Sequence, residues 1–244
     1  MIPIVELKNH GLMGGVLNGK WVRSTLAAPK IKKETEFVLV GWNGVEEGGV
    51  TLAKKGEQED VCQDFTRFDF ELDQDHGVAI GSNAKWNPVP RALKQIDATN
   101  ATYVTVVTNF LRRKGIAKPI IRIKEAFRVD LDGDGVEEAV LSATYYKNST
   151  EPSTAPGDYS FVIVRTAKGK VVTDHMLIGE FYLKNTQFGA PNEHHISAIA
   201  DLNGDGKMEI VLYGFYYEGG FATAFEMRKG IPAQIKEFDI ACGV

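Results

Sequence analysis

The chain of 244 residues lacks several features that would assign it to a class at once. It has no run of about 18 apolar residues, so the sequence predicts no transmembrane helix. It also has no excess of basic residues, because 28 Lys and Arg stand against 32 Asp and Glu. A general nucleic-acid-binding protein needs a basic face or stripe. We therefore expect a globular protein with no membrane span and no nucleic-acid partner.

Cysteine is scarce as well. The chain has two cysteines, Cys62 and Cys242, and no Cys-x-x-Cys pair, so cysteines alone cannot form a zinc site. They are compatible either with one disulfide that fixes the C-terminal segment or with two separate buried thiols. Export to an oxidising compartment would favour the disulfide.

The sequence contains none of several common catalytic or nucleotide-binding motifs and no recognisable signal peptide. The chain has no Gly-x-Ser-x-Gly motif, and the glycine-rich stretch at 11–15 has neither Walker nor dinucleotide-binding spacing. The first 21 residues show no basic segment followed by an apolar one, so no signal peptide is visible. The expectation of a secreted protein, with its signal peptide removed, therefore depends on the features described below.

Glycine, in contrast, is abundant at 25 of 244 residues, and this content predicts many tight turns. Phe68 and Phe70 alternate with acidic residues, as in a half-buried strand. Other segments are rich in β-branched and aromatic residues and are expected to be strands: 37–40, 120–123, 161–164, 176–181, 211–217 and 221–225.

A single helix is predicted over residues 99–114. Apolar residues recur there at helical spacing, and the pattern ends in a basic turn followed by Gly115. We therefore predict a β-rich α+β fold of mostly antiparallel sheet. The segment 87–90 suggests a boundary between a β-rich part at 1–90 and an α+β part at 91–244, although one continuous domain is the alternative. Residues 147–158 are rich in Pro, Ser and Thr and are expected to form an exposed loop.

The chain contains an internal repeat. Residues 130–146 (DLDGDGVEEAVLSATYY) and 201–217 (DLNGDGKMEIVLYGFYY) match at an offset of 71, with ten identities in 17 positions. Chance alone would give about one identity, so the repeat indicates a shared unit of loop, strand and aromatic end. Residues 71–77 resemble a degraded third copy that lacks the first Asp.

Each repeat begins with a loop of the form D-x-[DN]-x-D-G-x-x-E, which places several oxygen ligands within nine residues. Such clustered carboxylates repel one another without a cation, and this set of ligands suits Ca²⁺ better than Mg²⁺. The sequence therefore predicts two Ca²⁺ sites, with backbone carbonyl ligands at Val136 and Lys207. The expected side-chain ligands are Asp130, Asp132, Asp134 and Glu138 in the first loop, and Asp201, Asn203, Asp205 and Glu209 in the second.

These loops differ from EF-hands. An EF-hand requires a bidentate Glu at position 12 and flanking helices, whereas position 12 is Leu141 or Leu212 and strand-like segments follow. An acidic residue at position 9 followed by a strand resembles the FG-GAP or VCBS type of calcium-binding repeat. The arrangement also resembles bacterial exported proteins of unknown function that carry two such loops near the C-terminus.

The resemblance implies calcium-bearing, propeller-like blades in an extracytoplasmic (periplasmic, cell-surface or secreted) binding or adhesion protein. Only two clear loops are present, whereas a closed propeller needs at least four blades, so degenerate blades are the alternative fold. The expected partner is a protein or carbohydrate ligand. A calcium-dependent, phosphatase-like hydrolase and a purely structural domain of an assembly are the alternative functions, and enzymatic activity stays undecided.

Three further groups of residues are weaker candidates for a site. Glu193-His194-His195 is not expected to form a metal site, because adjacent strand residues point to opposite faces. Asp174-His175 could form half of an acid–base pair, but no nucleophile motif accompanies it. The aromatic residues near 213–221 suggest either a ligand surface or ordinary burial on a sheet.

Overall fold

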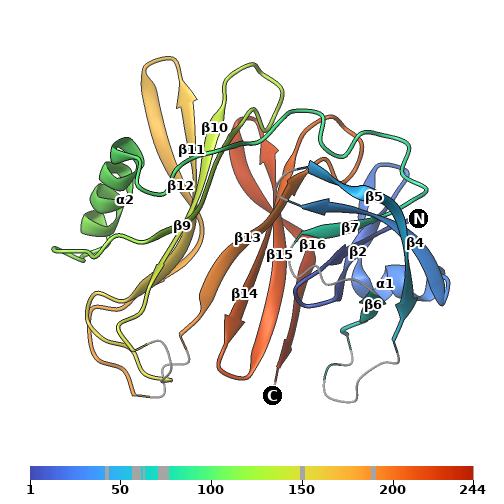
Figure 1. Ribbon diagram of the computed structural model, residues 1–244, viewed down its shortest axis with the longest axis horizontal. Helices are drawn as coiled ribbons and strands as arrows, with labels where there is room; N and C mark the ends of the chain where they lie inside the picture. Colours follow the sequence, from blue (N-terminus) through green and yellow to red (C-terminus); the bar gives the residue numbers. More distant parts are fainter. Residues whose placement is uncertain are drawn as a thin grey trace.

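The computed structural model describes residues 1–41, 44–56, 62, 64–70, 77–148, 152–187 and 191–243, with backbone only for 44–49. Three antiparallel sheets of seven, five and four strands form successive layers, and the longer helix covers the outer face of the five-stranded sheet (Figure 1). The four-stranded sheet is the middle layer. The predicted β-rich α+β class is confirmed.

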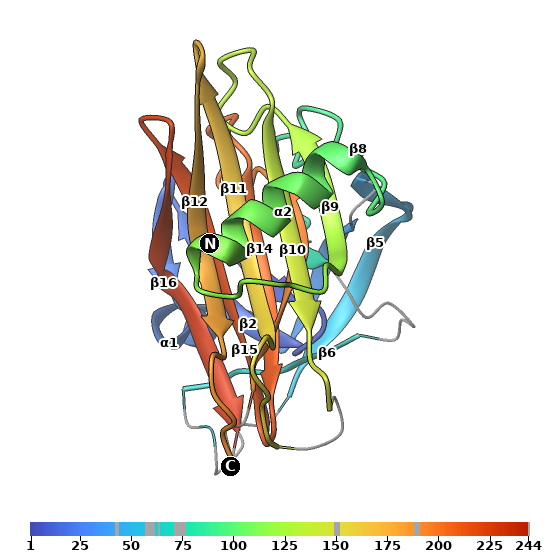
Figure 2. The same ribbon diagram turned by 90° about the vertical axis from the view of Figure 1, so that its left-hand side faces the viewer.

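The five-stranded sheet has the order β12-β11-β10-β9-β8. Its strands are β8 (Lys94–Gln95), β9 (Ile123–Val129), β10 (Glu138–Tyr145), β11 (Tyr159–Lys168) and β12 (Val171–Phe181). Helix α2 (Ala101–Arg113) crosses this sheet (Figure 2) and packs Val107, Phe110 and Leu111 against its apolar face. The Asn100 side chain accepts a hydrogen bond from the Thr102 N–H, which starts the helix within two residues of the predicted position.

The four-stranded sheet is a meander with the order β13-β14-β15-β16. Its strands are β13 (Glu193–Ala200), β14 (Glu209–Tyr216), β15 (Gly219–Arg228) and β16 (Ile231–Gly243). Along β14, Ile210 and Leu212 pack toward the five-stranded sheet, while Val211 packs toward the seven-stranded sheet. Both faces of the sheet are therefore buried, which is why β14 reads as an almost continuous apolar run.

The seven-stranded sheet has the order β3-β2-β1-β7-β4-β5-β6. Its strands are β1 (Ile2–Glu6), β2 (Gly11–Leu17), β3 (Lys20–Arg23), β4 (Glu34–Gly41), β5 (Gly44–Lys55), β6 (Phe68–Phe70) and β7 (Val78–Gly81), and helix α1 (Ser24–Ala27) follows β3. A bridge between Gly11 and Arg67 brings β2 close to the β6 end, so the sheet curls around a core of its own. A second core joins Ile4 and Ile80 to Val211 and Phe238 of the middle sheet.

The internal repeat corresponds to two four-stranded meanders, β9–β12 and β13–β16, packed face to face. Each meander carries the Asp-rich loop between its first and second strands, at 130–137 and 201–208. The repeat is thus a structural unit of about four strands, although only its first half is visible as sequence identity. Three packed sheets do not form the closed ring of blades of a propeller.

Two local predictions are wrong. The segment 120–123 joins β9 only at Ile123; Ile120 is 52% exposed, and its carbonyl accepts the hydroxyl of Tyr159 instead of a strand partner. The loop at 147–158 is not wholly exposed, because Asp158 is buried and accepts hydrogen bonds from the N–H groups of Lys147 and Ala155. The degraded third copy lies, apart from Gly77, outside the described residues.

The alternative left open for the cysteines is resolved. Cys62 and Cys242 form a disulfide, with Cα atoms 5.6 Å apart, that ties β16 to the segment before β6. In the part of the chain that the structure describes, neither helix is long and apolar enough to cross a bilayer.

Candidate metal centre

The two Asp-rich loops lie side by side at one end of the molecule, the upper end in Figure 1. The first loop leads from β9 into β10, and the second leads from β13 into β14. The backbone N–H of Met208 in the second loop donates to the carbonyl of Leu131 in the first (2.8 Å). The face-to-face packing of the two meanders therefore places the two predicted sites next to each other.

The first Asp of each loop shapes the turn. Asp130 Oδ1 and Oδ2 accept the N–H groups of Gly133 (2.8 Å) and Gly135 (3.0 Å). The same two bonds join Asp201 to the glycines at 204 and 206, at 2.7 and 2.9 Å. All four glycines have φ between 79° and 87°, a region that other residues rarely adopt, so the glycine spacing fixes the loop shape.

The Glu at position 9 closes each loop. Glu138 Oε2 accepts the N–H of Leu131 (3.0 Å), and Glu209 Oε2 accepts the N–H of Leu202 (2.8 Å). Glu138 is 4% exposed and Glu209 1% exposed. Each loop therefore holds a carboxylate that is buried at the start of a core strand.

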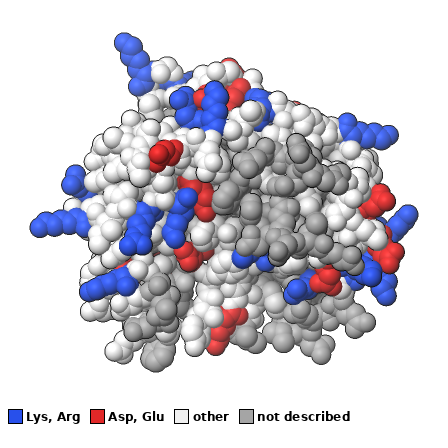
Figure 3. All heavy atoms as spheres, in the orientation of Figure 1, with Lys and Arg blue, Asp and Glu red and all other residues white. Residues whose placement is uncertain are grey.

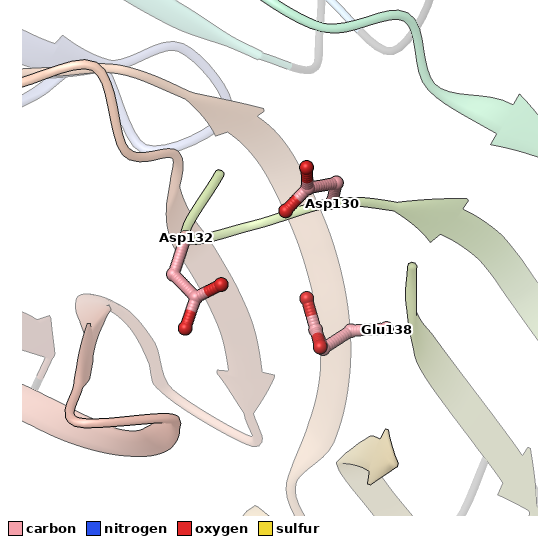
Figure 4. A group of neighbouring side chains, drawn as sticks. All are labelled: Asp130, Asp132 and Glu138. Carbon is pink, nitrogen blue, oxygen red and sulfur yellow. The ribbon is translucent and has the colours of Figure 1, made fainter. Parts of the chain in front are cut away.

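The first loop brings three acidic side chains together. Oxygens of Asp130, Asp132 and Glu138 lie within 4.8 Å of one another and surround a common space (Figure 4). Among the residues that the structure describes, the buried Oδ1 of Asp132 has no hydrogen-bond partner, and neither does the buried Oε1 of Glu209 in the second loop. Buried polar atoms nearly always have a hydrogen-bonding or coordinating partner, and a bound cation would be such a partner for both oxygens.

Burial and neighbouring charges make these glutamates unfavourable as free anions. Burial raises the pKa of Glu138 to about 7, and the charges of Asp132 and Asp134 add to the effect. Burial likewise raises the pKa of Glu209 to about 9, with Asp205 and Asp201 contributing. A cation between these carboxylates would reverse the balance and favour the charged forms.

The remaining predicted ligands take local roles. The exposed Asp134 and Asp205 accept the N–H groups of Val136 (2.8 Å) and Lys207 (2.9 Å). Asn203 holds the place of Asp132 and accepts the N–H of Asp205 (2.8 Å). Among the described residues, three clustered acidic side chains are found in the first loop; the second offers an amide oxygen at the corresponding position.

A supporting segment at 84–95 was not recognised as part of the site. The indole of Trp86 donates to the carbonyl of Asp201 (2.8 Å), and the guanidinium of Arg91 donates to the carbonyls of Asp130 and Leu131. Trp86 and Arg91 therefore hold equivalent carbonyls of the two repeats. The prolines of this segment suggest a domain boundary, whereas the segment crosses both Asp-rich loops. Its Trp and Arg side chains are the features of the sequence that point to a role at the loops.

The first loop also opens onto a hollow. Asp132, Asp134 and Glu138 line a cavity of about 650 Å³ together with side chains from two neighbouring hairpins, among them Lys168, His175 and Lys229. Lys168 and Lys229 are exposed. Acidic and basic groups therefore face one another across this opening.

The histidine candidates have structural surroundings. His195 stacks on Tyr213, and its Nδ1 lies 3.0 Å from Glu125. Burial opposes its charge, but the hydrogen bonds to Glu125 and Glu193 outweigh burial and raise its pKa to about 9. The neighbouring His194 is 2% exposed, and burial lowers its pKa to about 4. The two rings have opposite protonation preferences and are not set up as a pair of metal ligands.

Asp174 and His175 do not form an acid–base pair. The carboxylate of Asp174 lies 2.6 Å from both Arg113 and Arg165, while His175 Nε2 is 3.0 Å from the Thr166 hydroxyl. Adjacent strand residues point to opposite faces, which accounts for the separation.

On the face shown in Figure 3, acidic and basic side chains are interspersed, so the acidic cluster at the first loop is a local feature. No protein-family model, curated protein or solved structure matches this chain.

Proposed function

We propose that the chain is an extracytoplasmic calcium-binding protein in which two Ca²⁺ ions stabilise a module that binds a ligand. The observation that carries this proposal is the convergence of Asp130, Asp132 and Glu138 oxygens within 4.8 Å. Repetition of the same loop hydrogen bonds at Asp201 and Glu209 supports a second site.

Calcium fits these loops better than magnesium. Ca²⁺ accepts six to eight oxygen ligands with flexible geometry, including carboxylates, amides and carbonyls. Mg²⁺ requires a near-octahedral arrangement and keeps several waters. The first loop offers up to four carboxylates and the second offers three carboxylates and an amide, and both sets match the ligand preference of Ca²⁺.

A location outside the cytoplasm is supported by two features. Disulfides such as Cys62–Cys242 persist in oxidising compartments. Calcium loops without the full EF-hand ligand set suit surroundings in which Ca²⁺ is millimolar.

The proposal is tested by the stoichiometry of bound calcium. Metal-stripped protein dialysed against about 2 mM Ca²⁺ in excess Mg²⁺ should retain two Ca²⁺ per chain, in the concentration range of extracellular modules. Asp132→Ala and Glu209→Gln should each reduce this number to one. Retention of no calcium, or an unchanged number in both variants, would refute the proposal.

A calcium-dependent hydrolase is a second candidate, favoured by the cavity at the first loop. Loop carboxylates there face Lys168, His175 and Lys229, a set that would suit a metal ion and an anionic ester. Calcium-dependent release of p-nitrophenol from p-nitrophenyl phosphate, lost in Lys229→Gln but kept in the exposed control Lys170→Gln, would support it. No release above the uncatalysed rate would exclude this substrate class.

A further inference from the structure

A second hollow lies at the other end of the two repeated strands. Tyr145-Tyr146 ends the first repeat and Tyr216-Tyr217 ends the second, and all four tyrosines line one cavity of about 390 Å³ together with Phe215. Strand β10 has eight residues, so this hollow is about 25 Å from the calcium loops at about 3.3 Å per residue. The repeat thus brings two related pairs of aromatic side chains together.

The aromatic walls are held in place on one side and open on the other. The hydroxyl of Tyr146 donates to the carbonyl of Asn192, whose side chain is in turn bonded to Glu180. Tyr217, by contrast, is 67% exposed. The hollow therefore combines a positioned ring with a ring whose face is available to a ligand.

Charged groups at the rim leave one cation uncompensated. Lys124 Nζ lies 3.7 Å from Glu193 Oε1, and the His195 ring lies 3.6 Å from Glu193 and 3.0 Å from Glu125, so these two cations and two carboxylates balance. The exposed Arg122 guanidinium lies 5.4 Å from the centre of the Tyr145 ring, and within the described residues no carboxylate forms an ion pair with it. A planar guanidinium with free N–H groups is well suited to bind a carboxylate with two hydrogen bonds.

We propose that this hollow binds an acidic sugar, a pyranose ring that carries a carboxylate. The C–H face of such a ring packs on the exposed aromatic face of Tyr217, its carboxylate pairs with Arg122, and its hydroxyls bond to Glu193 and Lys124. A cationic ligand would meet Arg122 at close range. A purely apolar ligand would leave the charged groups of the rim without compensation.

This inference deepens the proposed ligand-binding role and names a ligand class for it. It uses a site separate from the calcium loops, and the cavity volume lies within the range of small-ligand sites, about 300–1,000 Å³.

The test is an isothermal titration calorimetry experiment in which galacturonic acid di- and trisaccharides are added to the calcium-saturated protein. The matching neutral galactose oligosaccharides serve as comparison. We expect binding of the acidic series and at least tenfold weaker binding of the neutral series, because a hydrogen-bonded charged pair contributes about one to two factors of ten.

Two variants locate the site. Arg122→Gln keeps the length and polarity of the side chain and should weaken acidic-sugar binding about tenfold. Tyr217→Ala removes an exposed ring and should weaken it about three- to tenfold. The exposed Arg112→Gln on α2 is the control, because it removes the same charge outside the hollow.

Equal binding of acidic and neutral sugars, or unchanged binding in both variants, would overturn the proposal. Binding of a poly-glutamate peptide in place of every sugar would also overturn it and would indicate a protein ligand. The calcium count after dialysis, made on the same preparation, separates the two proposals. Sugar binding by a protein that fails to retain Ca²⁺ on dialysis would refute the calcium proposal alone, and retention of calcium without sugar binding would refute this one alone.

Discussion

Calcium should raise the stability of the folded chain by an amount that can be assigned to individual loops. A ligand that binds only the folded state at 100 times its dissociation constant adds about 2.7 kcal/mol per site. In a chain of 150–250 residues, 1 kcal/mol corresponds to about 2–4 °C in Tm. Saturating Ca²⁺ should therefore raise the Tm by about 5–10 °C for each occupied loop.

The structure suggests one variant per loop. Asp132→Ala removes a carboxylate whose buried Oδ1 has no hydrogen-bond partner in the described part of the chain, so the metal-free fold should lose little. Glu209→Gln keeps an acceptor for the N–H of Leu202 and removes a carboxyl group that is 1% exposed and whose ionisation burial disfavours. The metal-free Glu209→Gln protein should therefore be at least as stable as the metal-free wild type. Each variant should lose the calcium-dependent shift of its own loop.

The assay is thermal unfolding of metal-stripped protein with Ca²⁺, with Mg²⁺ or with neither, followed by circular dichroism. Asp239→Ala, which removes an exposed carboxylate of β16, is the matched control and should keep the full shift. An equal shift with Mg²⁺, or a full calcium shift in both loop variants, would refute the reasoning. No shift at all would mean that the loops are acidic turns whose shape depends on their own hydrogen bonds.

Three other predictions follow from single contacts. The pKa of His195 is raised in the fold to about 9, so its stabilisation is fully present below about pH 6.5 and is lost as the pH rises through 9. The difference in unfolding free energy between the wild type and His195→Gln should fall by on the order of 3 kcal/mol across this pH range in urea titrations, and a pH-independent difference would contradict the prediction. Reduction of Cys62–Cys242, which closes a separation of 180 residues, should cost about 4 kcal/mol in the same titrations, and an unchanged midpoint would contradict it. Gly204→Ala should lower the Tm more than Gly135→Ala. Both glycines have positive φ, but a Cβ at position 204 would lie 2.8 Å from the indole of Trp86, whereas a Cβ at position 135 would meet open space. Equal decreases in Tm would contradict this prediction.

Local features of the fold could be predicted from the sequence where one physical signal dominates. The helix at 101–113 combines apolar periodicity, basic residues in its last turn and a following glycine, and all three agree. The segment at 120–123 shows the limit of such reasoning. Its β-branched residues indicate a strand, but the carbonyl of Ile120 bonds to the Tyr159 hydroxyl, a contact that depends on a residue 39 positions away.

The candidate sites divide in the same way. The candidate loop ligands could be predicted because they are close in sequence, and the repeat supplied a second copy. The proposed sugar hollow could be predicted only in part: the aromatic residues near 213–221 suggest a ligand surface, but Arg122 and Glu193 line the same cavity only through the packing of the two meanders. The sequence feature that points to this hollow is the Tyr-Tyr pair at the end of each repeat, but such a pair is also typical of ordinary burial on a sheet. Trp86 was missed because its role depends on where the chain crosses the loops.

The contacts between the two loops imply that a bound calcium ion would act on the pair of meanders and not on each hairpin alone. The Met208 N–H bonds directly to Leu131 of the other loop, and Trp86 and Arg91 of one segment hold the carbonyls of Asp201 and Asp130. An ion that restrains the backbone of one loop would therefore also restrain a group that is hydrogen-bonded to the other loop. Since β10 and β14 begin at these loops and end at the aromatic hollow, metal binding at one end would restrain the relative position of the tyrosine pairs at the other.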